Sequence, residues 1–224
     1  DDQFAPLADR IKAALNTLGS DTPKFLLNTH FHGDHVGGNA EFGGDSVIVA
    51  HENVRIRMAS GDAPSVALPV VTYDDDVSIH FNGEMVTLIH MPQGHTDTDS
   101  VVYFEDSDVI HMGDHFFNGA FPFVDLANGG TVQGYIDNLE KVLSWISDDT
   151  SEIPGHGPLA TKRDLLNFYN VVKDTSIDIR VKKSQRMSAE EIVAEGLGAE
   201  LESWGQGFIS EEAWINTVYN SYPR

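Results

Sequence analysis

The sequence predicts a mixed α/β fold, on three observations. Of its 224 residues 41% are hydrophobic, and 12 Phe, 6 Tyr and 3 Trp supply the bulk that a packed core needs. Some segments place apolar residues at helical spacing, whereas others are short, β-branched and bounded by turn residues. Area scaling for a chain of this length gives about 70% burial of the unfolded surface. We therefore expect one domain over residues 1–224.

Helices and strands are predicted to alternate in the first third of the chain. The apolar residues of the first helix fall on one face, and the helix is expected to stop at Gly19. The segment with Gly61, Pro64 and Pro69 has the composition of a loop. We expect, in order, a helix over 7–18, strands over 24–28 and 46–50, a helix around 54–58 and a loop over 60–69.

The middle of the chain is predicted to be rich in strands, and the end rich in helices. Asn82-Gly83 between two alternating segments indicates a hairpin. Thr161 with Asp164 and Ser188 with Glu191 have the spacing of capping boxes, and Ser210 is an expected N-cap. We expect strands over 77–81, 84–90, 100–105 and 109–112, a helix over 133–146, and a helical C-terminal part over about 159–224.

Charge and cysteine content exclude several functions. The chain carries 14 Lys and Arg against 35 Asp and Glu, a formal charge of −21, which repels phosphate backbones and argues against nucleic acid as a partner. Without Cys there are no disulfides, Cys-type zinc fingers, iron–sulfur clusters or thiol nucleophiles. Any metal site must therefore use the 10 His and the carboxylates.

Membrane insertion and targeting signals are not evident. No run of about 18 apolar residues occurs, so we expect a protein that does not enter a membrane. The sequence opens Asp1-Asp2-Gln3 without a basic segment followed by an apolar one, which leaves the compartment open. The oligomeric state is also left open.

A dense group of metal-binding side chains follows the strand predicted over 24–28. It reads His30-Phe31-His32-Gly33-Asp34-His35. Alternate residues of an extended chain point the same way, so His30 and His32 can share one ion while Asp34 and His35 face a second. Imidazole with carboxylate suits Zn²⁺, Fe or Mn²⁺ better than Ca²⁺ or Mg²⁺. The alternative interpretation is a solvated His tract.

Three further segments place His or Asp beside small residues, two of them after a predicted strand and the third after the short apolar Ile153. They are Gly94-His95-Thr96, Gly113-Asp114-His115 and Gly155-His156-Gly157. In this order the four segments resemble those of the metallo-β-lactamase-fold hydrolases, over a motif-bearing core at about 24–158. The resemblance implies a four-layer αβ/βα sandwich with two metal ions at the rim between two sheets. Family members usually carry two or more strands before the Asp that precedes the first helix. One expectation is that the first sheet lacks them; the other is that they lie outside this sequence.

The resemblance assigns each ligand a place. It implies that His30, His32 and His95 hold one zinc ion. It also implies that Asp34, His35 and His156 hold the other, with Asp114 bridging both. Two Zn²⁺ against two carboxylates and a hydroxide leave the site nearly neutral.

The implied reaction is hydrolysis of a carboxyl derivative. A hydroxide between two metal ions would attack a lactone, ester, thioester or β-lactam, and a metal would stabilise the oxyanion. Asp34 is the candidate catalytic residue that helps to orient the hydroxide. A small-molecule substrate is therefore the expected partner, with two Zn²⁺ as cofactors and Fe or Mn as alternatives.

Subfamily features narrow the substrate. Lactamases that bind their second metal through Cys are excluded, and Asp114 favours the lactonase-like and glyoxalase II-like branches, in which that Asp is a ligand. His32 argues against the electron-transfer members, which have Glu there. A mononuclear iron dioxygenase of the same fold that acts on a persulfide, a β-lactamase, and a non-catalytic binding module remain as alternatives.

The remaining His and aromatic residues have simpler interpretations. His115 could line the site or lie behind it, and His51 is expected to cap or pack. Structural roles are expected for His80, His90 and His111. The aromatic run after Asp114 is either core or a substrate wall, and Trp204 and Trp214 are expected in the core. The run comprises Phe116, Phe117, Phe121, Pro122 and Phe123.

Overall fold

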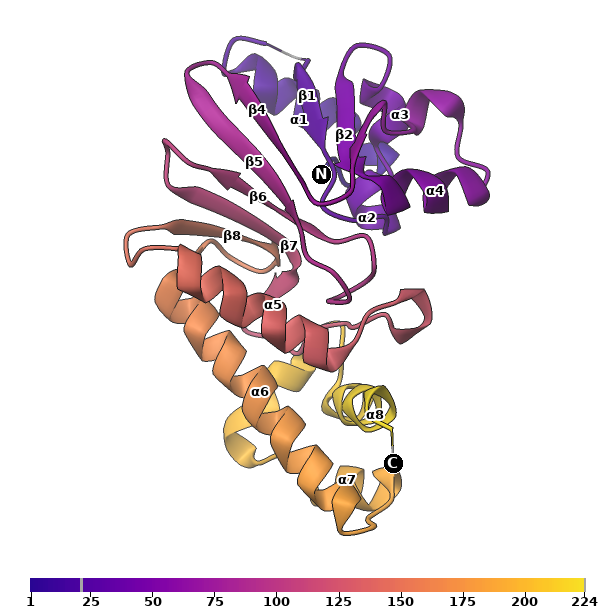
Figure 1. Ribbon diagram of the computed structural model, residues 1–224, viewed down its shortest axis with the longest axis vertical. Helices are drawn as coiled ribbons and strands as arrows, with labels where there is room; N and C mark the ends of the chain where they lie inside the picture. Colours follow the sequence, from indigo (N-terminus) through magenta and orange to yellow (C-terminus); the bar gives the residue numbers. More distant parts are fainter. Residues whose placement is uncertain (21, 224) are drawn as a thin grey trace. The chain divides into compact units, whose positions relative to one another are not determined.

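The chain is a mixed α/β protein with two β-sheets and helices, as the sequence predicts (Figure 1). The structure is a computed structural model and describes residues 1–20 and 22–223. The chain divides into two compact units. The N-terminal unit comprises Asp1–His90 and Thr98–Ser107, and the C-terminal unit comprises Met91–Asp97 and Asp108–Arg224. A single domain over residues 1–224 stays a prediction.

A three-stranded parallel sheet organises the N-terminal unit. Its strands are β1 (Phe25–Leu27), β2 (Val47–His51) and β3 (Val71–Tyr73), in that order. The helices of this unit are α1 (Ala8–Asn16), α2 (Gly33–Val36), α3 (Asn39–Phe42) and α4 (Glu52–Ser60), with one-turn 3₁₀ helices η1 (Ala5–Leu7) and η2 (Ser65–Ala67). Parallel strands that are buried on both faces consist almost entirely of apolar residues, and β1 and β2 have this composition.

Alternation along β2 separates two parts of the N-terminal core. Ile48 packs with Ala8 and Phe42 of the helical side, whereas Val49 packs with Leu88 and Val102 of the antiparallel strands. Successive side chains of a strand point to opposite faces, so one strand serves both clusters.

An antiparallel meander completes the N-terminal unit. It consists of β4 (Asp76–Phe81), β5 (Glu84–His90) and β6 (Ser100–Phe104). Asn82 and Gly83 join β4 to β5 with φ of +56° and +79°, the two positive values that a tight hairpin turn requires. The predicted hairpin is confirmed.

Three strands and a long helix begin the C-terminal unit. β7 (Val109–Phe117) pairs in parallel with β8 (Ser151–His156), and β8 pairs with β9 (Ala160–Thr161) in antiparallel fashion. The 3₁₀ turn η3 (Leu126–Asn128) and α5 (Val132–Trp145) connect β7 to β8. Thr131 caps α5 by accepting a hydrogen bond from the Gly134 N–H.

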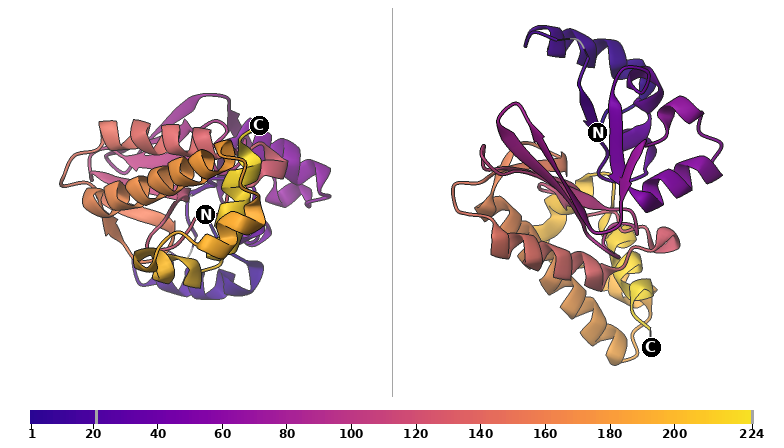
Figure 2. Two further views of the ribbon diagram at one scale, coloured as in Figure 1. Left: turned by 90° about the horizontal axis from the view of Figure 1, so that it is seen from below. Right: turned by 45° about the horizontal axis from the view of Figure 1, so that its top comes forward.

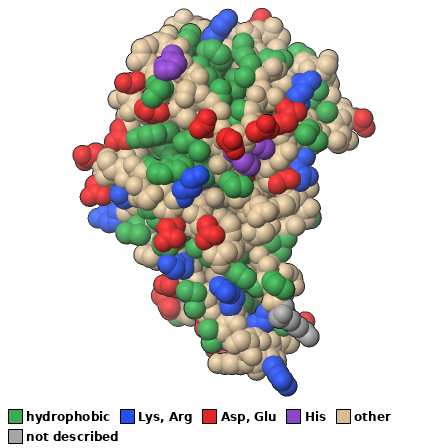
Figure 3. Space-filling view, in the orientation of Figure 1, with side chains coloured by type: hydrophobic (Ala, Val, Ile, Leu, Met, Phe, Trp, Pro, Cys, Tyr) green, Lys and Arg blue, Asp and Glu red, His purple; other side chains and the backbone are tan. Residues whose placement is uncertain are grey.

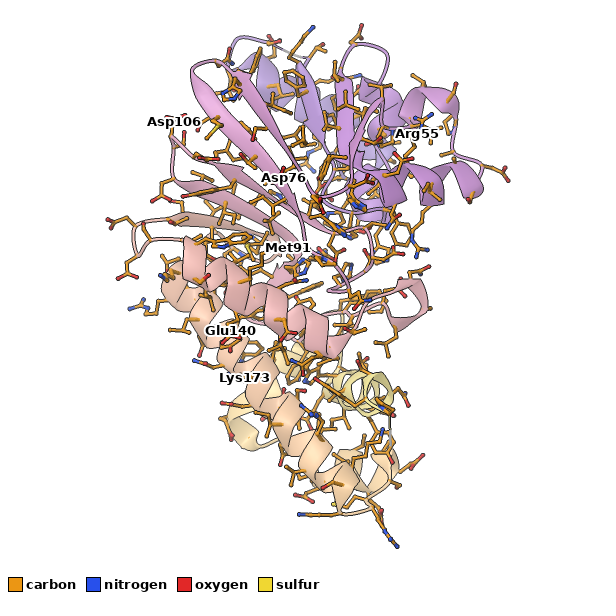
Figure 4. All side chains as sticks on the ribbon, viewed as in Figure 1. Arg55, Asp76, Met91, Asp106, Glu140 and Lys173 are labelled. Carbon is orange, nitrogen blue, oxygen red and sulfur yellow. The ribbon has the colours of Figure 1, made fainter. Side chains whose placement is uncertain are left out.

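The helices α5 and α6 (Lys162–Ser184) run side by side in all three views (Figures 1 and 2). Glu140 on α5 and Lys173 on α6 are labelled where the two helices face each other (Figure 4). Thr161 and Asp164 form the predicted capping box of α6, because Asp164 Oδ2 accepts from the Thr161 N–H at 2.9 Å.

The last third is helical, as predicted. It contains α7 (Ala189–Glu195), the 3₁₀ segment η4 (Ala199–Gln206) and α8 (Glu211–Ser221). Ser188 and Ser210 are the N-caps of α7 and α8. Trp214 is fully buried and donates from Nε1 to Thr175 Oγ1 (2.9 Å), and Trp204 stacks on Phe168. Both Trp are therefore core residues, as expected.

The structure also differs from the predictions. The short elements α2, α3 and β3 were not predicted. β7 was predicted to end at residue 112, with Asp114 beyond it, but the strand continues through Asp114 to Phe117. The register shifts on either side of Gly113, whose φ is +51°. Gly and Asp are both disfavoured in regular strands, and the bulge allows β7 to include Gly113 and Asp114.

Acidic side chains are spread over the visible face (Figure 3). This distribution is what a solvated surface of a −21 chain requires. Among the described residues, no helix combines the length and apolarity needed to cross a bilayer.

Candidate metal centre

The turn after β1 carries four of the predicted ligands: His30, His32, Asp34 and His35. The chain leaves the sheet at Asn28, whose N–H still donates to Val49 O at 3.0 Å. The buried Asn28 side chain donates from Nδ2 to His35 O at 3.2 Å and so closes the turn. α2 begins directly after His32. Strand, turn and helix start therefore compress the four ligands into one short segment.

Within this segment the side chains form two close pairs. His30 Nε2 lies 3.1 Å from His32 Nδ1, and His35 Nε2 lies 3.6 Å from Asp34 Oδ2. Two ligands of one tetrahedral zinc ion, each about 2.1 Å from it, lie roughly 3.4 Å apart. His30 and His35 are almost fully buried, whereas His32 and Asp34 are partly exposed. Each pair has the spacing and chemistry to share an ion.

Two residues that the sequence analysis did not single out orient His35. Asp1 Oδ2 lies 2.8 Å from His35 Nδ1, which leaves His35 Nε2 for a metal. Thr29 fixes the Asp1 carboxylate, since its N–H donates to Oδ1 and its hydroxyl to Oδ2, at 2.8 and 2.9 Å. Asp2 accepts from the Gly38 N–H at 3.0 Å, and burial raises the pKa of Asp2 to about 6. The one signal in the sequence was the Asp that the resemblance places before the first helix, to which the sequence analysis gave no role at the site.

The other three predicted ligands lie in the C-terminal unit. Asp114 is inside β7, His156 is the last residue of β8, and His95 lies in the segment 91–97. Because β7 and β8 are neighbours, Asp114 and His156 come to the same end of the sheet.

The Asp114 carboxylate faces a different imidazole with each oxygen. Oδ2 lies 3.5 Å from His95 Nε2, and Oδ1 lies 3.4 Å from His156 Nε2. Both distances match the edge of about 3.4 Å between two ligands of one tetrahedral ion. His95 and Asp114 are buried, whereas the His156 side chain is 44% exposed. A carboxylate in this position can bind one ion through each oxygen.

The second nitrogen of His95 has the kind of partner that metal-binding His residues need. His95 Nδ1 donates to Phe123 O at 2.7 Å, which directs Nε2 toward Asp114. The Tyr135 hydroxyl donates to the Asp114 backbone carbonyl at 2.8 Å and anchors this part of β7 on α5. Phe123 and Tyr135 are further residues that the sequence analysis did not assign to this role.

His115 lies behind the site. Its ring stacks on Tyr135 at 5.2 Å, and Asn138 Nδ2 lies 3.1 Å from His115 Nε2. His115 contacts Tyr135 and Asn138 of α5, whereas the Asp114 carboxylate faces the imidazoles of His95 and His156. Of the two open interpretations, the structure supports the buried, hydrogen-bonded one.

Of the remaining His, His51, His90 and His111 have the structural roles that were expected, whereas His80 does not. His51 caps α4 by accepting from the Asn53 N–H at 3.2 Å and stacks on His90 at 3.7 Å. His90 Nδ1 bonds to Asp99 O at 2.8 Å. His111 accepts from the Gly113 N–H, and His80 is exposed.

The aromatic run after Asp114 divides between core and site. Phe116 and Phe121 are fully buried and pack on other aromatic residues of the core. Phe117 stacks on His156 with ring centroids 4.9 Å apart, and Phe123 lies 5.7 Å from the His95 ring. This second pair therefore lies beside two candidate ligands, whereas the first pair belongs to the core.

The donor set fits a transition metal. Seven of the side chains described above are candidate ligands: His30, His32, Asp34, His35, His95, Asp114 and His156. Five imidazoles and two carboxylates suit Zn²⁺, Fe or Mn²⁺, whereas Ca²⁺ and Mg²⁺ prefer oxygen ligands throughout. Buried His and Asp at metal-ligand spacing are costly unless they pair or bind a cation.

Sequence relatives include metal-dependent hydrolases. The probable metallo-hydrolase YqgX of Bacillus subtilis (strain 168) is 27% identical over 163 residues, 66% of this chain and 77% of that protein. A hydroxyacylglutathione hydrolase of Prochlorococcus marinus (strain MIT 9301) is 27% identical over 163 residues, 72% of this chain. This chain spans 61% of the length of the Prochlorococcus enzyme.

Solved structures with a similar fold include metallo-beta-lactamases. The enzyme from Pontibacter korlensis matches with a TM-score of 0.65 at 19% identity, over 76% of this chain and 78% of that one. DIM-1 matches with a TM-score of 0.65 at 15% identity, over 78% and 80%. At these identities the likeness shows the fold, as the resemblance implied.

The family model of the metallo-beta-lactamase superfamily matches residues 4–159. The chain therefore belongs to the metallo-beta-lactamase superfamily.

Proposed function

We propose that the chain is a metal-dependent hydrolase that uses two zinc ions to cleave a carboxyl derivative. Membership of the superfamily and hydrolases among the relatives support the reaction class. The substrate is a small molecule of the lactone, ester, thioester or β-lactam class. In this proposal His30, His32 and His95 hold one ion, and Asp34, His35 and His156 hold the other.

One observation carries the proposal of two ions. The two oxygens of Asp114 lie 3.5 and 3.4 Å from two different imidazoles, those of His95 and His156. A carboxylate that bound a single ion, or that formed an ion pair with a single His, would need an imidazole beside only one of its oxygens. Asp114 is therefore the proposed bridge.

Bound at these residues, two ions would supply a water molecule of lowered pKa and a Lewis acid for the substrate carbonyl. The chain's own residues supply position and exclusion of water. In this proposal Asp34, whose side chain is 32% exposed, helps to orient the attacking water. Phe117 and Phe123 offer an apolar wall beside the imidazoles of His156 and His95.

The proposed bridging role of Asp114 also indicates which class of substrate to expect. A bridging carboxylate is the pattern of the lactonase-like and glyoxalase II-like branches, and a hydroxyacylglutathione hydrolase is among the relatives. Thioesters and lactones are accordingly the first substrates to test, and β-lactams the last.

A substrate panel tests this function. The zinc-loaded protein is assayed with a lactone, an aryl ester, a thioester and a β-lactam, beside Asp114→Ala and the surface control Asp9→Ala. We expect cleavage of a lactone, ester or thioester by the wild type and by Asp9→Ala, and loss of about 10²-fold or more in Asp114→Ala. Cleavage of the β-lactam alone would contradict the assignment of Asp114. No cleavage of any substrate would contradict the hydrolase.

A further inference from the structure

A basic pocket lies in the C-terminal unit, where α6 ends beside α8. It is a cavity of about 670 Å³, and Arg180, Lys183, Arg186, Tyr219 and Tyr222 are among the residues that line it. None of its described lining residues is Asp or Glu. Cavities of this size hold small organic molecules. Basic side chains are visible around this end of α6 (Figure 3).

The pocket is separate from the candidate ligands. None of its lining residues is a candidate metal ligand. Arg180 lies 18 residues into α6, so at 1.5 Å per residue it is about 27 Å along the helix from Lys162. The helix α6 therefore carries the pocket well away from His156, which precedes its start.

The three basic residues of the pocket, Arg180, Lys183 and Arg186, make different contacts. Lys183 donates from Nζ to Tyr219 O and Tyr222 O, each at 2.6 Å, and so fixes the end of α8. Its charge also complements the C-terminal end of the α6 dipole. Arg180 and Arg186, in contrast, make no ion pair with any described carboxylate. The chain has 35 acidic and only 14 basic residues, so most basic groups can find a carboxylate partner. Two guanidinium groups beside one cavity without such a partner therefore indicate a function for their charge.

The walls of the pocket are fixed. The Arg180 guanidinium lies over the Tyr222 ring, 4.2 Å from its centroid. Ser176 Oγ donates to the Tyr222 hydroxyl at 3.2 Å, and the Tyr219 hydroxyl donates to Met187 O at 3.3 Å. Ordered walls lower the conformational cost of binding a ligand.

Arg186 occupies a backbone position that normally favours Gly. Its φ is +72°, and its N–H and that of Met187 bond to Lys183 O and Lys182 O, the pattern of a helix end with a left-handed residue. A side chain with a Cβ is disfavoured in that conformation. Arg186 combines a strained backbone with a side chain that lines a pocket, so a role for its guanidinium explains why Arg rather than Gly stands there.

We propose that this pocket binds a small organic anion that carries phosphate or carboxylate groups. Guanidinium groups bind both oxyanions through paired N–H donors. The cavity is larger than a single phosphate group, so the ligand has a carbon body as well. This site is independent of the proposed hydrolase activity.

Calorimetric titration at low ionic strength tests the site with two probes, phenyl phosphate and phthalate. The variants are Arg180→Gln and Arg186→Gly, with Lys182→Gln as the matched control. Lys182 is the sequence neighbour of the pocket residue Lys183, but it does not line the pocket. Its Nζ is instead paired with Asp178 and Glu195, at 2.8 and 2.9 Å. Removal of Lys182 therefore changes the net charge equally without removing a pocket residue.

We expect saturable binding of at least one probe, weakened about tenfold or more in Arg180→Gln and Arg186→Gly and within about twofold of wild type in Lys182→Gln. The stronger probe distinguishes a phosphate from a carboxylate ligand. Arg186→Gly relieves the backbone strain, so its melting temperature should equal or exceed that of the wild type. No saturable binding of either probe, or an equal loss in Lys182→Gln, would overturn the proposal.

Discussion

Gly155 lies directly against the carboxylate of Asp114. A Cβ at position 155 would come within 3.0 Å of Asp114 Oδ1 and of the Gly113 carbonyl, closer than real Cβ atoms approach other groups. Gly155 thus allows β8 to pass close to β7 at the point where Asp114 presents its oxygens to two imidazoles. We expect Gly155→Ala to displace this carboxylate.

The first prediction follows from that contact. Gly155→Ala should reduce the hydrolase activity about 10²-fold and lower the metal content, because a displacement of about 1 Å at a catalytic group has effects of this size. Steady-state kinetics and metal analysis measure both. Gly44→Ala is the control, since a Cβ there meets nothing within 4 Å. Full activity in Gly155→Ala would contradict the role of Asp114.

The second prediction concerns Asp1, which orients His35. Asp1→Ala should weaken binding of the ion held by His35 about 10- to 100-fold, the usual effect of removing a hydrogen-bond partner of a metal ligand. Competition with a chelator measures the affinity of each ion. Asp9→Ala removes the same charge from an exposed position of α1. Unchanged affinity for both ions in Asp1→Ala would refute this role.

The third prediction concerns Glu152, a buried residue of β8 outside the candidate ligands. Burial, and next the charge of Asp164, raise its pKa from 4.5 to about 8, although Lys162 opposes the shift. Neither carboxylate oxygen has a hydrogen-bond partner among the described residues.

Between pH 4.5 and about 8 the folded chain keeps the Glu152 proton that the unfolded chain has released. The free energy of unfolding should therefore fall as pH rises through this window. Glu152→Gln should flatten the profile, and urea unfolding at several pH values measures it. The exposed Glu140→Gln should retain the wild-type slope. An unchanged slope in Glu152→Gln would show that Glu152 is ionised in the folded chain.

The fourth prediction separates His115 from its neighbour Asp114. His115→Ala should lower the free energy of unfolding by about 1–3 kcal/mol, because it leaves the buried Asn138 amide without one of its partners. Metal content and kcat should stay close to those of the wild type. Loss of kcat at unchanged stability would instead place His115 in the active site.

Local chemistry made much of the fold predictable. Asn82-Gly83 predicted a hairpin because few residue pairs accept two positive φ values, and Thr161 with Asp164 predicted a helix start. The extension of β7 could not be read from the sequence, since Gly113 and Asp114 are disfavoured in strands. Pairing of β7 with β8 outweighs this local preference.

The candidate site was predictable in residue type and less so in its supporting contacts. The spacing of His30, His32 and His35 after an apolar strand was sufficient to propose a metal site. The bond between Asp1 and His35 joins residues 34 positions apart. The sequence carries no local signal for such a contact, and the same holds for the Phe123 carbonyl behind His95.

Metal analysis of the purified protein tests the central claim most directly. We expect about two zinc ions per chain in the wild type and in Asp9→Ala, about one in His156→Ala, and loss of both in Asp114→Ala. The zinc-loaded wild type should also hydrolyse a carboxyl derivative without consuming oxygen. One iron per chain with oxygen uptake on a persulfide, or no bound metal at all, would contradict it.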